Sequence, residues 1–312
     1  MEPHKIHNLP ESARHALARS GIGLSELIPA LGAGPDAAVL LVGSHATGRA
    51  SADSDLDFLI LLEGEEEYAS PRVGSKLRMA TPIAERHLAL AGSLEVDVEV
   101  IRAEPLSLLV EGIHRLDQLG SRPDAAFAGF PILQDIELRI MARLRSGIVL
   151  SGDDRVTRWR ADLGTGLLPM YATLMYFLGA MASLEDSFSL LQSDSSSLGA
   201  AIAGRAAAER LALSALAYYG NIEIELRYAL ELTAKSTRDG DPIPKILTDL
   251  GGMLFPDIRL VREYFDRVFE YAVDLFRFFR RYEKYPGLAN GISWFGRDRW
   301  RVDTTFLRDS HG

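Results

Sequence analysis

The chain has 312 residues, of which 47% are hydrophobic and 25% are charged, and its formal net charge is −9. This length accommodates two domains of ordinary size, and the composition is typical of a soluble globular protein. Because the sequence has no cysteine, disulfides, thiolate metal sites and cysteine nucleophiles are excluded. The acidic balance and the scattered basic residues disfavour a nucleic-acid-binding protein, which usually carries a basic patch.

The first residues, Met-Glu-Pro-His-Lys-Ile-His-Asn, contain no apolar core of signal-peptide length. The longest apolar run, residues 167–182, is interrupted by Pro169 and Gly179. It is short and broken for a membrane span, so it is expected to be a buried helix. We therefore expect a soluble cytoplasmic protein that does not contact a membrane, and the lack of cysteine fits a reducing compartment.

The N-terminal third alternates short helices and strands. Helices are expected over 11–19 and 25–31, before the breaker Gly-Ala-Gly-Pro. An apolar strand over 37–42 leads into a Gly/Ser turn and a short polar connection, and a second strand follows over 55–62. This arrangement brings the turn and the start of the second strand together.

The turn and the second strand carry the residues that point to chemistry. Asp55 and Asp57 are two residues apart, so they project to the same face of a strand, while Leu56 turns into the core. Two carboxylates at this spacing repel each other, and a divalent cation such as Mg²⁺ removes that penalty. Gly43 has no Cβ, so the Gly43-Ser44 backbone can approach a phosphate closely. The pattern predicts metal-assisted phosphoryl or nucleotidyl transfer.

The full string GSHATGRASADSDLD, residues 43–57, resembles the signature of the DNA-polymerase-β-type nucleotidyltransferase superfamily. It is similar in particular to small bacterial members that act on antibiotics or other small acceptors. The resemblance is dense over 42–59 and extends as a fold to about residue 152. It implies that Asp55 and Asp57 bind Mg²⁺, with two ions expected, that Gly43 and Ser44 hold a nucleoside triphosphate, and that a third carboxylate arrives on a later strand.

Three other residues of the string are considered for contact with the substrate. The guanidinium of Arg49 suits phosphate geometry, but a solvent-exposed loop arginine fits the sequence nearly as well. Ser54, directly before the aspartates, is a second candidate for nucleotide binding. His45 contacts either phosphate or nothing of the substrate. Arg49 and Ser54 are therefore added to Gly43 and Ser44 as candidate nucleotide-binding residues.

A third strand, expected over 94–101, offers a choice for the third carboxylate. Its apolar residues alternate with Glu95, Asp97 and Glu99. Three acids on one strand face are destabilising unless something cationic lies opposite, and the alternative is a solvated outer face of an edge strand. We favour Asp97, which valines flank, as a metal ligand or general base toward the acceptor hydroxyl. Glu95 is the alternative, because some antibiotic-modifying relatives use a glutamate in a similar context.

The segments around this strand are assigned by pattern. Residues 76–91 are interpreted as an amphipathic helix, with Pro82 as a kink or as its true start. Helices are expected over 104–119 and 132–145, with a Gly/Pro/Asp-rich connector over 120–131 between them. The run 148–150 could be a last strand at the sheet edge. A nucleotidyltransferase domain is therefore expected over residues 1–152.

The remainder has a helical pattern. Helices are expected over 153–163, 167–187, 199–219, 223–237, 244–250 and 258–282. Long helices with short connections predict an antiparallel bundle, and a phenylalanine stripe in the last of them predicts its core. The chain after Pro286 is interpreted as irregular. We predict an acceptor-binding bundle over 153–290 and a Trp-containing tail over 291–312, so the fold class is α+β.

The expected activity is Mg²⁺-dependent transfer of a nucleoside monophosphate, with release of pyrophosphate, onto a hydroxyl of a small-molecule acceptor. ATP is the expected donor because the resembled family commonly uses it. The alternatives are a regulatory or toxin–antitoxin-type nucleotide-binding module, or nucleotidyl transfer onto protein or tRNA. The sequence fixes neither the acceptor nor the oligomeric state, and a homodimer is one of the states it leaves open.

Overall fold

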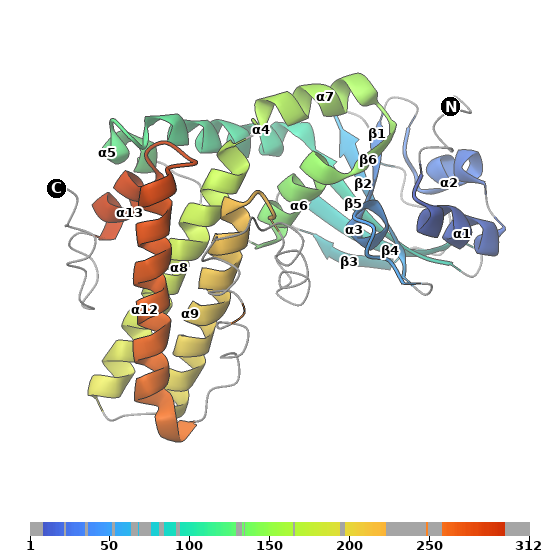
Figure 1. The fold of residues 1–312 in the computed structure, drawn as a ribbon. Coiled ribbons are helices and arrows are strands. Elements are labelled where there is room, and N and C mark those ends of the chain that lie inside the picture. Colours follow the sequence, from blue (N-terminus) through green and yellow to red (C-terminus); the bar gives the residue numbers. More distant parts are fainter. Residues whose placement is uncertain are drawn as a thin grey trace. The chain divides into compact units, whose positions relative to one another are not determined.

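The computed structural model describes residues 9–21, 23–34, 37–51, 54–63, 68, 76–80, 84–91, 94–128, 133, 135–164, 166–193, 197–222, 248 and 258–296. The chain forms two compact units (Figure 1). The first comprises Met1–Glu111 and Leu133–Thr165, and the second comprises Gly112–Ile132 and Gly166–Gly312. The first unit therefore extends past residue 152, and the assignment of the units to catalysis and acceptor binding stays a prediction.

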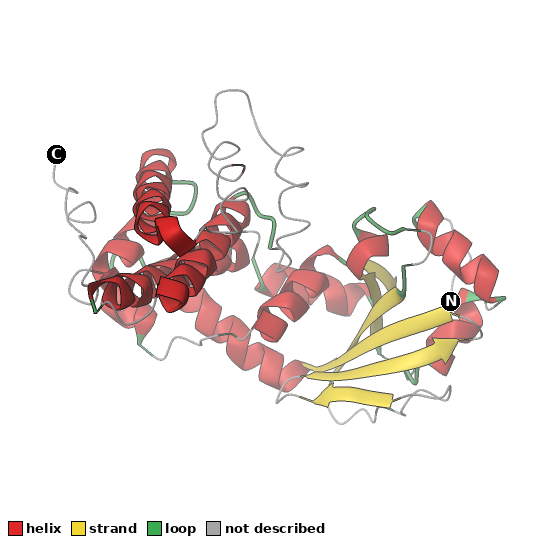
Figure 2. Ribbon diagram, turned by 90° about the horizontal axis from the view of Figure 1, so that it is seen from below, coloured by secondary structure: helices red, strands yellow, loops and turns green. Residues whose placement is uncertain are grey.

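The first unit is built on a six-stranded mixed sheet with the order β3-β4-β5-β2-β1-β6 (Figure 2). The strands are β1 (Ala38–Val42), β2 (Leu56–Leu62), β3 (Lys76–Ala80), β4 (Ala84–Ala91), β5 (Leu94–Arg102) and β6 (Ile148–Ser151). Strands β2 and β5 are parallel, and the other neighbouring pairs are antiparallel. The predicted α+β class and small mixed sheet are confirmed, and β6 lies at the sheet edge as expected.

Short helices accompany this sheet. They are α1 (Glu11–Ser20), α2 (Leu24–Ala30), α3 (Gly43–Ala46), α4 (Ala103–His114), α6 (Asp135–Ser146) and α7 (Asp153–Asp162). Glu63, at the end of β2, accepts a hydrogen bond from Trp159 Nε1 at 3.1 Å and contacts Arg155 Nε at 3.6 Å. These contacts from one carboxylate attach α7 to the end of the strand.

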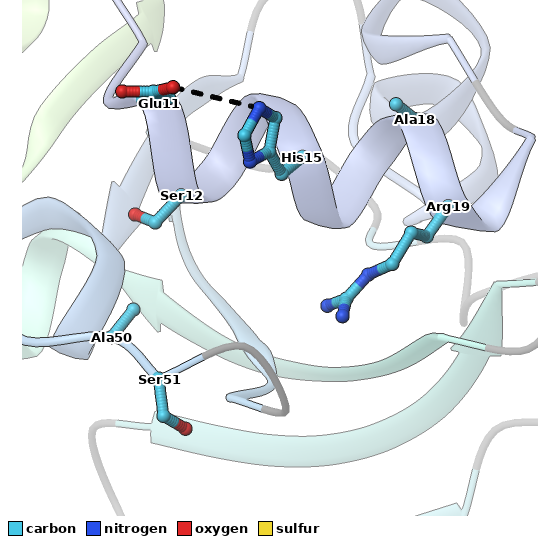
Figure 3. A pocket seen from close by; sticks show the side chains of 7 residues that line it. All are labelled: Glu11, Ser12, His15, Ala18, Arg19, Ala50 and Ser51. Atoms are coloured by element: carbon cyan, nitrogen blue, oxygen red, sulfur yellow. Dashed lines mark ion pairs between the residues drawn. The ribbon is translucent and has the colours of Figure 1, made fainter.

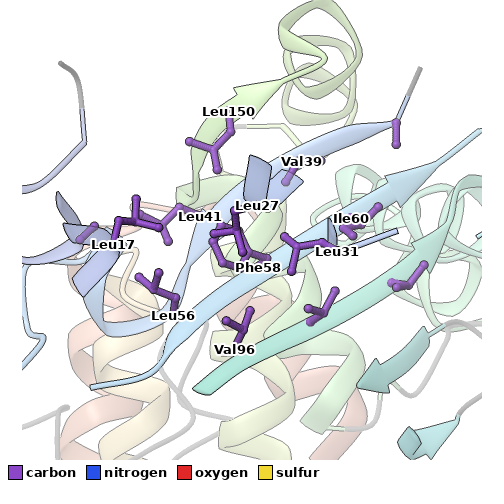
Figure 4. Close-up of a cluster of buried hydrophobic side chains, with 14 of the residues drawn as sticks. Leu17, Leu27, Leu31, Val39, Leu41, Leu56, Phe58, Ile60, Val96 and Leu150 are labelled. Atoms are coloured by element: carbon purple, nitrogen blue, oxygen red, sulfur yellow. The ribbon is translucent and has the colours of Figure 1, made fainter. Parts of the chain in front are cut away.

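One face of the sheet is covered by α1 and α2, whose apolar side chains form a continuous core with the strands (Figure 4). Leu17 of α1 and Leu27 of α2 belong to this core, together with Phe58 of β2 and Val96 of β5. Because side chains alternate along a strand, the residues between these positions point to the opposite face. Asp57 and Asp97 are therefore on the face that α1 and α2 do not cover.

The prediction of a helix over residues 76–91 is wrong, because the segment contains strands β3 and β4, which pair with each other. The apolar spacing matched a helix, but β5 needs a partner for its outer backbone edge, and β4 pairs with it from Ala84 to Ala91. Arg86 and His87 point to opposite faces in this strand. Tertiary pairing thus decides the structure of a segment whose local pattern is ambiguous.

Among the residues described, the second unit contains only helices. They are η2 (Arg115–Gln118), α5 (Pro123–Phe127), α8 (Leu167–Gln192), α9 (Ser197–Tyr218), η3 (Ile258–Leu260), α12 (Val261–Tyr282) and α13 (Leu288–Gly296). Phe177 of α8 packs against Phe276 and Phe279 of α12, with ring centroids 6.3 and 6.0 Å apart. The phenylalanine stripe is thus core, as the spacing predicted.

Helix α8 is long and apolar enough to cross a membrane, but 72% of its most apolar window is buried inside the structure. Such burial is typical of the core helix of a soluble protein, in agreement with the interpretation of residues 167–182. Two other expectations are wrong. The connector over 120–131 contains α5, and the chain after Pro286 continues into α13.

Helix α13 forms because Leu288 and Ile292, four residues apart, bury one apolar stripe, which the Gly- and Trp-rich composition obscured. The helices expected over 223–237 and 244–250 lie outside the described residues, apart from Thr248, and so does the tail after residue 296.

Candidate active site

Gly43 and Asp57 lie against each other at the end of β1. The two strands pair with Val42 opposite Asp57, and Gly43 follows with φ +69°. A Cβ on Gly43 would be 2.0 Å from Oδ2 of Asp57 and 2.7 Å from its Cγ. Only glycine allows this backbone conformation beside this carboxylate. The turn and the second aspartate of the motif therefore form one local structure, as the sequence predicted.

The chain after Gly43 is held by its own hydrogen bonds. Thr47 Oγ1 donates to the Gly43 carbonyl at 2.9 Å, and the backbone N–H of Arg49 donates to the Ser44 carbonyl at 2.8 Å. The Nε of Arg49 donates to Thr47 Oγ1 at 3.0 Å. The Gly43-Ser44 turn is thus fixed without substrate, while Arg49 lies within the loop.

Ser54 and His45 make further contacts within the loop between β1 and β2. Ser54 Oγ accepts the backbone N–H of Ser51 at 2.8 Å. His45 is 1% exposed and lies between Ser12 Oγ, 3.1 Å from Nδ1, and the Ser54 carbonyl, 3.2 Å from Nε2. His45 therefore connects α1 to the loop, which is a structural position. The roles of Ser44, Arg49 and Ser54 in nucleotide binding stay predictions.

Strand β5 places two further carboxylates beside Asp57. In the parallel ladder Asp57 is opposite Asp97, and Glu99 is two residues further along the same face. Adjacent strands are about 4.8 Å apart, so the carboxylates of Asp57 and Asp97 are neighbours. Both β5 acids are almost fully buried, at 5% and 1% exposure. The alternative of a solvated outer face is wrong for these two residues.

Three arginines balance these acids. Arg86 of β4 donates from Nε to both carboxylate oxygens of Asp97, at 3.0 and 2.8 Å, and its Nη2 also pairs with Oδ2. Arg139 Nη2 donates to Glu99 Oε1 at 2.8 Å. Arg143 Nη1 is 2.9 Å from Glu99 Oε2, and its Nη2 is 3.4 Å from Asp57 Oδ1.

These arginines were missed in the sequence. Arg139 and Arg143 are four residues apart on α6, so they share one helix face that meets the acids. The sequence feature that could have indicated them was the row of acids on β5, because such a row requires cations on the element packed against it. Arg86 could not be found while its segment was interpreted as a helix.

The pKa of Asp57 reflects this crowding. Burial raises it from an ordinary 3.8 to about 6, Arg143 opposes the rise, and Asp97 and Glu99 add to it. A carboxylate whose pKa is raised by burial although an arginine lies beside it is typical of functional sites. The folded protein therefore disfavours the charged form of Asp57.

Asp55 and Glu95 lie outside this cluster of charges. Asp55 is exposed and directly precedes β2. Glu95 is half-buried, and the ladder between β2 and β5 begins one residue later, at Val96. Within the described part of the chain, no three histidines or carboxylates already converge as ligands. Each remaining assignment, including Asp97 over Glu95, stays a prediction.

A separate groove of about 800 Å³ lies between α1 and the loop that contains Ala50 and Ser51 (Figure 3). None of the carboxylates just described lines it. Its lining comes from α1 and from the loop before Asp55, namely Glu11, Ser12, His15, Ala18, Arg19, Ala50 and Ser51. Oε1 of Glu11 is 3.8 Å from Nε2 of His15. The lining combines an acid, a guanidinium and hydroxyl groups, so it indicates no single ligand chemistry.

Comparison with known protein families decides the class of this unit. Residues 24–123 match the family model described as nucleotidyltransferase domain, and the matched segment includes β1, β2 and β5. The chain carries a nucleotidyltransferase domain. This confirms the family that the string from Gly43 to Asp57 resembles.

Two further comparisons add little to the nucleotidyltransferase assignment. A solved structure, a nucleotidyltransferase-like protein from Exiguobacterium sibiricum 255-15, aligns with a TM-score of 0.39 and 12% identity. The alignment covers 92% of this chain and 80% of that one. No curated protein matches the chain.

The fit between Gly43 and Asp57 in the nucleotidyltransferase domain gives a direct prediction. Gly43→Ala is expected to destabilise the protein by about 2–3 kcal/mol, because the new Cβ adds a clash to the cost of a positive φ. Gly48→Ala is the matched control, since Gly48 has φ +71° but no atom within 4 Å of a new Cβ. Urea denaturation of both variants measures the difference, and equal losses would show that Asp57 does not crowd position 43.

Proposed function

We propose that the protein transfers a nucleoside monophosphate from a nucleoside triphosphate to a hydroxyl group of a small-molecule acceptor. The acceptor oxygen would bond to the α-phosphorus, and the bond from that phosphorus to the bridging oxygen would break, so that pyrophosphate leaves. ATP is the first candidate donor. The observation that supports this most is the contact of Gly43 with Asp57 beside Asp97, inside a nucleotidyltransferase domain.

The residues fit a divalent cation. Carboxylate oxygens are the ligands that Mg²⁺ prefers. Asp57 is partly buried and lies beside the buried Asp97, and a cation would relieve the repulsion between them. Asp55, Asp57 and Asp97 would hold the metal, which would neutralise charge on the triphosphate. The backbone of Gly43 and Ser44 would face the phosphates, and Asp97 would accept the proton of the acceptor hydroxyl or orient the metal.

Two alternatives are distinguished by experiment. A regulatory module would bind nucleotide without turnover, and a protein- or tRNA-directed transferase would need a macromolecular acceptor. The presence of Asp55, Asp57 and Asp97 together favours an enzyme, because a degenerate relative would usually lack one of them. The net charge of −9 favours a small acceptor over tRNA. The lack of cysteine supports placing this enzyme in the cytoplasm.

The test is a thermal-shift titration with ATP, GTP, CTP and UTP, each with and without Mg²⁺. We expect Mg²⁺-dependent stabilisation by one triphosphate, worth about 2.7 kcal/mol at a hundredfold excess over Kd. The shift should disappear in Asp57→Ala and persist in Asp266→Ala, which removes an exposed carboxylate of α12. Pyrophosphate release with candidate acceptors then follows. The absence of any Mg²⁺-dependent shift in the wild-type protein would reject the proposal.

A further inference from the structure

Both carboxylate oxygens of Asp97 accept hydrogen bonds from Arg86. The guanidinium reaches both oxygens of Asp97, from Nε at 3.0 and 2.8 Å and from Nη2. Bidentate pairs of this kind are the stronger form of ion pair. A carboxylate that binds Mg²⁺ must offer a lone pair at about 2.0–2.1 Å. A cation that approaches Asp97 therefore competes with Arg86 for the same two oxygens and is repelled by the like charge of the guanidinium.

Arg86 differs from Arg143 in how firmly it is held. Arg143 is 18% exposed, and its guanidinium pairs with the carboxylate of Glu99, which is 1% exposed. Arg86 is 38% exposed, and among the described residues the hydrogen bonds of its guanidinium go to Asp97. The side chain of Arg86 is therefore more open to solvent than that of Arg143.

Arg86 also lies within the electrostatic field of the whole cluster. Asp97, Glu99 and Asp57 all favour its charged form, and Arg86 in turn opposes the rise in the pKa of Asp57. Asp57 contacts the Gly43 turn, so Arg86 is on the same face as the backbone proposed to meet the phosphates. A guanidinium that leaves Asp97 here would find a phosphate as its next anionic partner.

We infer that Arg86 is an exchangeable counterion, which pairs with Asp97 in the protein without nucleotide and moves to the triphosphate when nucleotide binds. This exchange frees Asp97 for a divalent cation. The inference rests on the proposed function and deepens it, because it makes Arg86 a triphosphate-binding residue and couples the two ligands. By linkage, cation and triphosphate then strengthen each other's binding by the same factor.

The experiment measures each ligand separately. Free Mn²⁺ is titrated by electron paramagnetic resonance against wild-type protein, Arg86→Met and the control Arg14→Met, which alters an exposed arginine of α1. We expect Arg86→Met to bind Mn²⁺ about tenfold more tightly than wild type, because a competing charge is removed. Inorganic tripolyphosphate is titrated by calorimetry in the presence of EDTA, and its affinity should fall about fivefold or more. Arg14→Met should match wild type in both.

Arg86→Lys keeps the positive charge but loses the contact of one guanidinium with both oxygens of Asp97. This variant tests the same exchange if Arg86→Met does not fold. It should bind Mn²⁺ about threefold more tightly than wild type. Unchanged or weaker Mn²⁺ binding in the variants would overturn the inference. An arginine that only held Asp97 in position would give that result, because its removal would not free Asp97 for the cation. That failure is distinct from failure of the proposed function, which the wild-type protein alone decides through its Mg²⁺-dependent response to triphosphates.

Discussion

Asp57→Asn is expected to abolish nucleotidyl transfer and, at the same time, to stabilise the unliganded protein at neutral pH. The loss of activity follows from the proposed role of Asp57 as a metal ligand. The gain in stability follows from its pKa, which burial raises to about 6. A group that destabilises the fold but is required for activity is typical of active sites.

The sign of the pH dependence is fixed by the direction of this shift. Asp57 is protonated more readily in the folded protein than in the unfolded chain, where its pKa is near 3.8. The folded state therefore binds more protons between about pH 4 and pH 6, and the free energy of unfolding falls as the pH rises through this window. The shift, which already includes the opposing effect of Arg143, corresponds to about 3 kcal/mol at most.

Urea denaturation of both proteins from pH 4 to pH 8 checks this. The difference between Asp57→Asn and wild type should be near zero at pH 4 and reach its plateau above pH 7. Asp55→Asn is the matched control, because Asp55 is exposed. It should lose activity and leave stability nearly unchanged. A difference for Asp57→Asn that does not vary with pH would show that its carboxyl is not destabilised by burial.

The sequence predicted the acids of this site better than the cations. Asp57 within an apolar strand and the alternation through Asp97 and Glu99 are local patterns, and a strand converts such a pattern directly into faces. The sequence also predicted the turn at Gly43, although the close approach of Gly43 to Asp57 was found only in the structure. Each of these predictions depends on neighbours within a few residues.

The arginines depend on long-range pairing and could not be predicted in this way. Arg143 is 86 residues from Asp57 in sequence, and Arg139 is 40 from Glu99. Arg86 meets Asp97 only because β4 lies beside β5 in the sheet, which the helix-like spacing of residues 76–91 concealed. His45, for which the sequence left two interpretations open, is buried between α1 and the loop, and those contacts are long-range or specific to the folded loop.

Glu99→Gln is expected to be the most destabilising single change in the charge cluster, by about 3–5 kcal/mol. Glu99 is 1% exposed and pairs with Arg139 at 2.8 Å and with Arg143 at 2.9 Å. Glutamine keeps the shape but removes the charge, so two largely buried guanidinium groups lose their shared partner. Urea denaturation at pH 7.5 measures the loss. Because Arg143 also contacts Asp57, transfer activity should fall even where the variant remains folded.

Glu95→Gln is the matched control, since it makes the same chemical change on the same strand at a half-buried position. It should cost less than about 1 kcal/mol. A double-mutant cycle then separates the two arginines: Arg139→Gln combined with Glu99→Gln should recover about 1–3 kcal/mol relative to the sum of the single changes. If Glu99→Gln costs no more than Glu95→Gln, Arg143 is held by α6 alone, and its position beside Asp57 does not depend on the third acid of β5.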